Sequence, residues 1–373
     1  MSKILVTGGA GFIGSHLVDV LLAKGHAVRI LDALIPQVHG ENATWPAWVP
    51  AGVERMIGDV RNPDVWVKAL EGMDVVYHLA AEVGVGQSMY EIVRYMEVNT
   101  MGTAVLLEIL SRGNHSIQKV IVASSMSIYG EGPYQTPDGQ VLHPMLRDEA
   151  RLRQGQWEHY LGNSATELTP LPTGEDKPLQ PTSIYAISKR DQEEMCLSVG
   201  IAYKIPTVAF RFFNVYGPRQ ALSNPYTGVA AIFSGRLLNR HAPVIFEDGL
   251  QSRDFIHVSD IVQGLVLGME RSEADYQAIN LGTGRQTSVL DVAQALNREL
   301  GLDIEPQIVT KFRAGDIRHC FADISKARQL LGFAPKVRFE DGVRELIGWV
   351  SQQTASDRVA DATAELAARG LTR

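Results

Sequence analysis

The chain has few cysteines, no long apolar run and no net positive charge, and each of these features excludes a class of function. The only cysteines among 373 residues, Cys196 and Cys320, have no close spacing, which argues against a disulfide framework and a thiolate metal site. No apolar run approaches the ~20 residues that a membrane span requires. The net charge of −7 offers no basic field for nucleic acid or an anionic membrane. We therefore expect a soluble cytoplasmic protein with no metal, nucleic-acid or membrane partner.

A glycine-rich turn stands between the first apolar run and a helical pattern. Residues 4–6 are apolar, and TGGAGFIG at residues 7–14 leads into leucines and valines at helical spacing. Such glycines let the chain turn tightly, approach a pyrophosphate and pack the helix on the strand. The free N–H groups at the start of the helix would then face the phosphates. The expected dinucleotide-binding residues of this turn are Gly8, Gly11, Phe12, Ile13 and Gly14.

An acidic residue ends the second predicted strand. Asp32 follows residues 27–31 and lies 18 residues after Gly14. A carboxylate there accepts hydrogen bonds from a ribose 2′-hydroxyl and repels a 2′-phosphate, which favours NAD over NADP. The alternative role for Asp32 is that of a turn residue.

Strand and helix patterns alternate along most of the chain. The seven predicted strands are residues 4–6, 27–31, 53–57, 75–79, 120–123, 207–213 and 278–281. This alternation predicts an α/β fold with a doubly wound, mostly parallel Rossmann sheet that binds ligands at the carboxyl ends of its strands. The cofactor-binding candidates at these ends are Asp59, Val60, Leu79, Ala80, Ala81 and Ser124.

Tyr185 and Lys189 are four residues apart, so on a helix their side chains share one face. A phenol normally titrates near pH ~10, but an adjacent ammonium favours the phenolate and lowers that pKa. The pair could serve as a general base and its activator. By itself it could equally be a surface pair.

Four motifs together resemble the extended short-chain dehydrogenase/reductase superfamily, over roughly residues 2 to 350. They are TGGAGFIG, the serine before Tyr129-Gly130, YAISK at residues 185–189 and RFFNVYGPR at residues 211–219. Members of that superfamily include nucleotide-sugar epimerases, dehydratases and decarboxylases. The resemblance implies NAD as cofactor, a nucleotide sugar as substrate, and a homodimer paired through helices 91–112 and 185–199. Burial of these helices within one chain is the alternative.

The resemblance also implies roles for single residues. Ser125 would hydrogen-bond the sugar oxygen, Tyr185 would be the base, and Lys189 would hold the nicotinamide ribose. Asn99 would support the lysine on the cofactor side, or merely pair with a backbone group. The implied substrate-binding residues are Val85, Gly86, Ser125, Tyr185, Asn214, Val244, Phe246, Arg253, Asn280 and Arg313.

The residues after Ser125 separate the reaction types. Dehydratases of the superfamily carry Asp-Glu there, because eliminating water requires an acid and a base, whereas this chain has Met126 and Ser127. The expected reaction is therefore NAD-dependent epimerisation at C4 through a transient 4-keto sugar, best matched by dTDP-L-rhamnose and dTDP-6-deoxy-L-talose. The alternatives are a UDP-hexose or UDP-hexuronate 4-epimerase, a net 4-keto-sugar reductase or dehydrogenase, and a non-catalytic NAD-binding regulator.

The expected domain organisation follows from the same resemblance. Residues 1–217 and 256–283 would form the NAD-binding domain, 218–255 and 284–350 the smaller nucleotide-sugar-binding domain, and 351–373 a C-terminal helix and tail. Residues 131–178 are a long insertion, and loops of such length are usually functional or disordered. Residues 152–182 resemble the insertion of dTDP-L-rhamnose 4-epimerases, although a cysteine pair that many of those carry is missing here.

Overall fold

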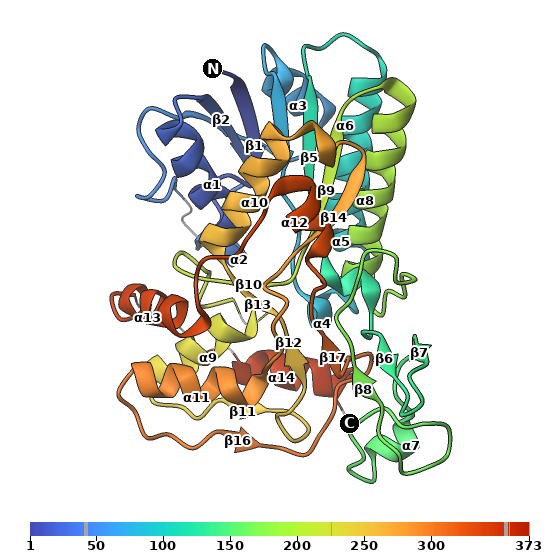
Figure 1. Cartoon of the computed structure of the whole chain (residues 1–373). Helices are drawn as coiled ribbons and strands as arrows, with labels where there is room; N and C mark the ends of the chain where they lie inside the picture. Colours follow the sequence, from blue (N-terminus) through green and yellow to red (C-terminus); the bar gives the residue numbers. More distant parts are fainter. Residues whose placement is uncertain (41–43, 225, 354–356, 358, 373) are drawn as a thin grey trace.

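A parallel sheet forms the centre of the computed structural model, which describes residues 1–40, 44–224, 226–353, 357 and 359–372 (Figure 1). Seven strands pair in the order β14-β9-β5-β4-β1-β2-β3, and every neighbouring pair is parallel. Their bounds are β1 Lys3–Thr7, β2 Ala27–Asp32, β3 Glu54–Ile57, β4 Val75–His78, β5 Lys119–Ser125, β9 Thr207–Phe212 and β14 Gln277–Leu281. The predicted doubly wound sheet is confirmed.

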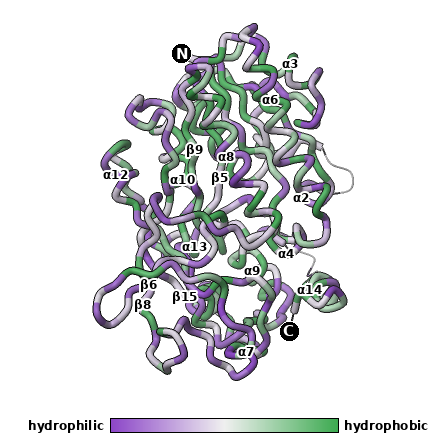
Figure 2. Tube along the Cα trace, turned by 90° about the vertical axis from the view of Figure 1, so that its right-hand side faces the viewer, coloured by the Kyte–Doolittle hydropathy of each residue, from purple (hydrophilic) through white to green (hydrophobic). Residues whose placement is uncertain are grey.

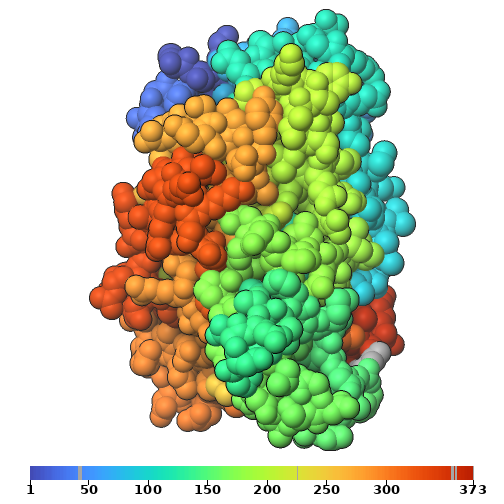
Figure 3. Space-filling model, turned by 45° about the vertical axis from the view of Figure 1, so that its right-hand side comes forward, coloured from blue at the N-terminus to red at the C-terminus, as the bar shows by residue number. Residues whose placement is uncertain are grey.

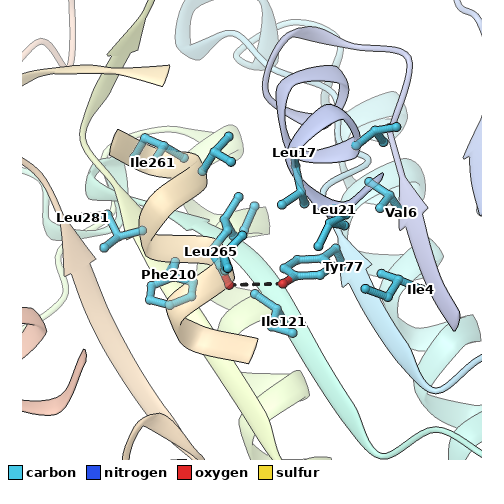
Figure 4. Close-up of a cluster of buried hydrophobic side chains, with 14 of the residues drawn as sticks. Ile4, Val6, Leu17, Leu21, Tyr77, Ile121, Phe210, Ile261, Leu265 and Leu281 are labelled. Atoms are coloured by element: carbon cyan, nitrogen blue, oxygen red, sulfur yellow. Dashed lines mark hydrogen bonds between the residues drawn. The ribbon is translucent and has the colours of Figure 1, made fainter. Parts of the chain in front are cut away.

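Helices cover both faces of this sheet, which explains why its strands are apolar without alternation. Along β1, Ile4 and Val6 pack under α1 (Phe12–Ala23) and α10 (Val258–Glu270), while Leu5 faces the other side. That other side is covered by α3 (Pro63–Leu70), α6 (Gly102–Ser111) and α8 (Ile184–Tyr203). In the first core, the Tyr77 hydroxyl donates a 3.2 Å hydrogen bond to the carbonyl oxygen of Leu265 (Figure 4). Strands and helices are thereby locked in one register.

The predicted helix at residues 91–112 is interrupted. It consists of α5 (Ile92–Tyr95), a π-helical turn at Met96–Met101, and α6. Its neighbour α8 begins at Ser183, whose hydroxyl accepts a 3.1 Å hydrogen bond from the Ala186 N–H as an N-cap. Because α6 and α8 pack side by side within the chain, part of their apolar surface is buried here, and the homodimer stays a prediction.

A smaller layer of structure lies below the sheet in Figure 1. Three helices form its core, α9 (Val229–Leu238), α11 (Val289–Glu299) and α13 (Phe339–Val350). Its strands pair as β10 with β13, β11 with β16, and β15-β12-β17. Their bounds are β10 Asn214–Tyr216, β11 Val244–Ile245, β12 Ser252–Arg253, β13 Phe255–His257, β15 Thr287–Ser288, β16 Gln307–Ile308 and β17 His319–Cys320.

One helix of the segment assigned to this smaller layer packs elsewhere. α12 (Ser325–Leu331) lies against β14, and its Ala327 and Leu331 are buried in the core of the large sheet. Apolar contact decides its place, since these side chains complete the face that α1 and α10 leave open near β14. The domain boundaries otherwise stay a prediction.

The long insertion at residues 131–178 is ordered. It contains α7 (Glu149–Leu152) and a small antiparallel sheet, in which β6 (Tyr134–Gln135) lies between β7 (Val141–Leu142) and β8 (Thr169–Pro170). Figure 3 shows its green surface against the orange C-terminal segments.

A buried charge cluster joins the insertion to the smaller layer. Arg318 donates to Glu247 at 3.0 Å, to Asp248 at 2.7 Å and to Glu158 of the insertion at 2.8 Å. The Arg318 side chain is 1% exposed. Glu131 of the insertion accepts from the backbone N–H groups of Arg318 and His319. Buried charges need such pairing, so the insertion is fixed to the smaller layer.

The C-terminal segment, predicted as a helix and tail at 351–373, contains α14 (Val359–Ala368). Residues 354–356, 358 and 373 lie outside the described part. None of the helices formed by the described residues has the length and apolarity to cross a bilayer.

Candidate active site

A cavity of about 1220 Å³ opens between the carboxyl ends of the parallel strands and the smaller layer. It is lined by every residue that the sequence nominated for cofactor, substrate or catalysis, except Asn99 and Asn280. The cavity also takes residues from the loop after β2, the loop after β4, α9 and α14. This is the place where a doubly wound sheet binds its ligands.

The glycine turn forms a cradle that has no room for side chains. Gly8 has a left-handed φ of +69°, and a Cβ there would lie 3.0 Å from the backbone of Ala80. A Cβ at Gly14 would overlap the carbonyl oxygen of Gly8. The amino end of α1 therefore comes close to the cavity, where its free N–H groups can bind phosphate oxygens.

Asp32 stands at the cavity edge and also fixes the glycine turn. Its carboxylate accepts hydrogen bonds from the backbone N–H of Ala10 at 3.0 Å and of Leu34 at 2.9 Å. His39, which the sequence analysis did not nominate, places its Nε2 3.8 Å from the same carboxylate. Burial lowers the pKa of His39 although Asp32 raises it, so the imidazole is neutral at physiological pH. Asp32 thus lines the cavity and holds the glycine turn in place.

The other residues predicted to bind the adenine and ribose of the cofactor either hydrogen-bond within the protein or line the cavity. Asp59 accepts from the Arg61 guanidinium at 2.6 Å, which lowers the pKa of the carboxyl. The carbonyl oxygen of Val60 accepts from the Trp66 indole at 2.6 Å. Leu79, Ala80 and Ala81 line the cavity with small or apolar side chains. These contacts leave a shaped, mostly apolar slot beside the strand ends.

Ser125 and Tyr185 meet at the cavity wall. Ser125 ends β5, Tyr185 lies in the first turn of α8, and both line the cavity, with the Ser125 hydroxyl near enough to Tyr185 to act on its pKa. The Ser127 hydroxyl donates a 2.9 Å hydrogen bond to the Ser125 oxygen. Ser127 therefore orients the Ser125 hydroxyl, and Ser125 and Tyr185 are both available to a substrate hydroxyl in the cavity.

Lys189 shares the helix face of Tyr185 but points its ammonium elsewhere. The ammonium donates to the carbonyl oxygen of Ala123 at 2.9 Å, and the residue is only 3% exposed. Burial lowers the pKa of Lys189 to about 7, with Cys196 opposing the shift.

The predicted lowering of the tyrosine pKa is wrong for the chain by itself. Burial raises the pKa of Tyr185 above that of a free phenol, and the nearby Ser125 hydroxyl only partly opposes this. The Lys189 ammonium donates to the carbonyl oxygen of Ala123 and not to the phenol.

Asn99 and Asn280 do not face the cavity. Asn99, in the π-helical turn, accepts from the N–H of Glu82 at 2.8 Å and donates to Ser188 at 2.9 Å, which fits its alternative role as a backbone partner. The expected substrate contact of Asn280 is wrong. Its amide donates to the carbonyl oxygens of Thr173 and Asp323, and its oxygen accepts from Tyr129 at 2.7 Å.

The two nominated arginines lie together at the smaller-layer side. Arg253 and Arg313 both pair with Asp316, at 3.2 Å and 2.8 Å. Arg313 also stacks on the ring of Phe246, with its guanidinium carbon 5.0 Å from the centroid. Together they leave a net positive charge beside an aromatic face, an arrangement that suits a nucleoside diphosphate.

Several buried polar atoms of the cavity lining have no hydrogen-bond partner among the residues that the structure describes. They are Ser124 Oγ, Asn214 Oδ1, Gln220 Oε1 and Gln251 Oε1. Buried polar groups are normally paired, so such atoms mark where a polar ligand would bind. Sequence analysis missed Gln220 and Gln251, although each stands within two residues of a nominated arginine or an arginine-containing motif.

The chain was compared with known proteins. Residues 4–147 match the model of the NAD dependent epimerase/dehydratase family, and residues 165–346 match that of GDP-mannose 4,6 dehydratase. The dTDP-L-rhamnose 4-epimerase of Burkholderia thailandensis is 35% identical, over 94% of this chain and 95% of its own length. This chain belongs to the NAD-dependent epimerase/dehydratase family.

Solved structures of this family share the fold. The UDP-glucose 4-epimerase of Thermotoga maritima, solved with UDP-glucose, matches with a TM-score of 0.76 and 30% identity, covering 94% of this chain and 99% of that one. The UDP-glucuronic acid 4-epimerase of Bacillus cereus, in complex with UDP-glucuronic acid and NAD, gives 0.75, 29% identity and the same coverage.

The family's cofactor, NAD, fits the residues present here. The glycine cradle has no room for side chains, the carboxylate of Asp32 suits a ribose diol, and the Ser124 hydroxyl has no partner in the described part of the chain. Among the described residues, no group of histidines, cysteines and acids is placed to hold a metal ion.

Proposed function

We propose that this member of the family catalyses NAD-dependent epimerisation at C4 of a nucleotide-diphospho-sugar through a transient 4-keto sugar. The observation that carries the proposal is that Ser125 and Tyr185 line the same cavity as the glycine cradle. Tyr185 takes the proton of the C4 hydroxyl and later returns it, while Ser125 holds the same oxygen. Ser127 keeps Ser125 in place, and Lys189 binds the nicotinamide ribose. Bound NAD supplies the chemistry of accepting and returning a hydride.

The acids of the cavity support epimerisation over elimination of water. Met126 and Ser127 occupy the positions after Ser125, and neither can act as a carboxylate acid or base. Each described acidic residue that lines the cavity is already engaged with the protein. These pairs are Asp32 with two backbone N–H groups, Asp59 with Arg61, Glu82 with Arg94, and Asp316 with two arginines.

The substrate we propose is dTDP-L-rhamnose or its C4 epimer, dTDP-6-deoxy-L-talose. Support comes from the Burkholderia relative and from the ordered insertion. A UDP-hexose or UDP-hexuronate is the second candidate, since structural relatives act on such sugars. A hexuronate adds a third negative charge, yet the described arginines of the lining already have acidic partners. These are Arg61 with Asp59, Arg219 with Asp19, and Arg253 and Arg313 with Asp316. An uncharged sugar is therefore favoured.

Product analysis tests the proposal. The purified protein is incubated separately with dTDP-L-rhamnose, UDP-glucose and UDP-glucuronate, and products are identified by NMR and mass spectrometry. We expect inversion at C4 without added NAD and without accumulation of NADH. Stoichiometric NADH would instead select a net dehydrogenase, and the absence of product from all three sugars would contradict the proposal. The homodimer and the cytoplasmic location stay predictions.

A further inference from the structure

The C-terminal end of the chain forms part of the cavity wall. We call residues 359–372 the C-terminal strap. Ala362, Thr363 and Leu366 of α14 line the cavity, and Ala362 is buried. Figures 1 and 2 both place α14 next to α4 (Val85–Ser88), the short helix that follows β4. The strap therefore faces ligand space as well as protein.

Contacts fix the strap to two loops that carry nominated substrate residues. Leu371 accepts a 2.9 Å hydrogen bond from the N–H of Ala314, and Thr372 forms an antiparallel bridge with Arg313. At its other side, the guanidinium of Arg369 stacks on the ring of Tyr90 at 4.4 Å. The strap thus spans from the diphosphate-binding arginine to the loop after β4.

Leu366 contacts the glycine loop at residues 83–88, which follows β4. A Cβ at Gly86 would lie 3.4 Å from Leu366 Cδ2, so this leucine packs on the backbone there. At Gly84 the same loop contacts Tyr95, because a Cβ there would lie 2.9 Å from the Tyr95 hydroxyl, and its helix α4 packs against α8, which carries Tyr185. The Tyr95 ring meets the Tyr185 ring edge-on at 6.5 Å. The glycine loop therefore links the strap to the proposed catalytic group.

The wall formed where strap and loop meet is apolar. Val83, Val85 and Met89 line the cavity and are 50%, 48% and 36% exposed, so they present apolar surface that the protein itself does not bury. On the strap side, Leu366 contacts Gly86 of this loop, and Ala362 also lines the cavity. A hydroxyl or carboxylate placed against it would lose water without gaining a hydrogen bond, whereas a methyl group would gain by burial.

We propose that the C-terminal strap selects the sugar, and that Leu366 favours a 6-deoxy hexose over a hexose with a hydroxymethyl or carboxylate group at C6. This inference rests on the proposed function and deepens it by naming the substrate class. An apolar pocket rejects an added hydroxyl by at most about a hundredfold. The expected preference is therefore about tenfold to a hundredfold in kcat/KM.

The test compares two sugars that differ only at C6, dTDP-L-rhamnose and dTDP-L-mannose. Calorimetry of the NAD-loaded protein gives the Kd of each sugar nucleotide and of dTDP alone, and turnover is measured in parallel. In Leu366→Gln we expect the preference for dTDP-L-rhamnose to fall about tenfold while the affinity for dTDP and the NAD content stay unchanged. Ala367→Gln, on the exposed face of α14, should match the unaltered protein.

The possible outcomes distinguish failure of the inference about the strap from failure of the proposed epimerase function. The inference would be overturned if Leu366→Gln weakened the binding of dTDP and of both sugar nucleotides equally, or if the unaltered protein showed no preference. The strap would then have a structural role only. A preference in Kd without any epimerised product would leave the strap's role standing and contradict the proposed function. Should Leu366→Gln fail to fold by its melting curve, Ala362→Ser makes the same comparison.

Discussion

The ammonium of Lys189 donates a 2.9 Å hydrogen bond to the carbonyl oxygen of Ala123, and this contact ties α8 to the end of β5. Ser125 lies on that same strand, and Tyr185 lies one turn before Lys189 on the same helix. The lysine therefore helps to hold the two hydroxyl groups together through the packing of helix on strand. This positioning role stands beside the cofactor contact that we propose for it.

Burial of Lys189 should make the stability of the NAD-free protein rise with pH between about 7 and 10.5. The pKa of Lys189 is about 7 in the folded chain and 10.5 in the unfolded one, so in this window the unfolded chain binds more protons. The slope from this group is at most about 1.4 kcal/mol per pH unit. Urea unfolding across the window should show a shallower slope in Lys189→Met, whereas Lys68→Met, at an exposed site, should keep it. Identical slopes in all three proteins would contradict the burial of a titrating lysine.

Replacing Tyr185 with phenylalanine should lower turnover by about a hundredfold or more, since general acid–base groups contribute about 10²–10⁴-fold. The ring and its edge contact with Tyr95 remain, so bound NAD per chain and the affinity for dTDP should be retained. The matched control is Tyr203→Phe at the far end of α8, where the tyrosine is 53% exposed. A fully active Tyr185→Phe protein would end the assignment of this residue as the base.

Adding one methyl group to the glycine cradle should weaken the binding of NAD. In Gly14→Ala the new Cβ would overlap the Gly8 carbonyl oxygen, and the turn must open. We expect the affinity for NAD to fall at least tenfold, or about 1.4 kcal/mol. Gly52→Ala adds the same group where no atom lies within 4 Å. Bound NAD, measured after mild denaturation of each protein, should be lost only from the first variant.

Arg318→Met should destabilise the protein by about 3 kcal/mol, because it removes a buried cation that three carboxylates share. Glu247 would keep Arg147 and Glu158 would keep His319, whereas Asp248 would lose its cation. Arg338→Met, at a side chain that is 73% exposed, should change little. Urea unfolding of both variants checks this, and equal stability would show that Arg318 does not hold the insertion.

The same cluster should make the protein sensitive to acid. Hydrogen bonds and ion pairs hold the pKa of Glu158 at about 2, well below its ordinary value of 4.5. A carboxyl with a depressed pKa contributes its full stability above about 4.5 and loses it as the pH falls toward 2. Melting temperatures between pH 5 and pH 3, roughly, should therefore fall less steeply in Glu158→Gln than in the unaltered protein. A parallel decline would contradict this assignment.

Most of the fold and the cofactor-binding side of the site could be predicted from local sequence patterns. Apolar runs predict buried strands, and the glycines at residues 7–14 predict a tight turn. Both depend on burial and backbone sterics, which act between residues close together in the sequence. Asn280 could not be placed in this way, because its hydrogen-bond partners Thr173 and Asp323 lie far away in the sequence. The pKa of Tyr185 was misjudged for a related reason: helical spacing shows that a lysine is near, but not that its ammonium turns to another element.

The position of β14 in the sheet has a consequence for synthesis of the chain. β14 comes from residues 277–281, yet it pairs with β9 from residues 207–212 and covers an otherwise open strand edge. Ribosomes extend chains at about 5–20 residues per second, so the nascent protein exposes that edge for several seconds. An uncovered parallel edge is a template for wrong pairing. Chaperone contact during translation should therefore centre on β9, and should end once β14 has left the exit tunnel.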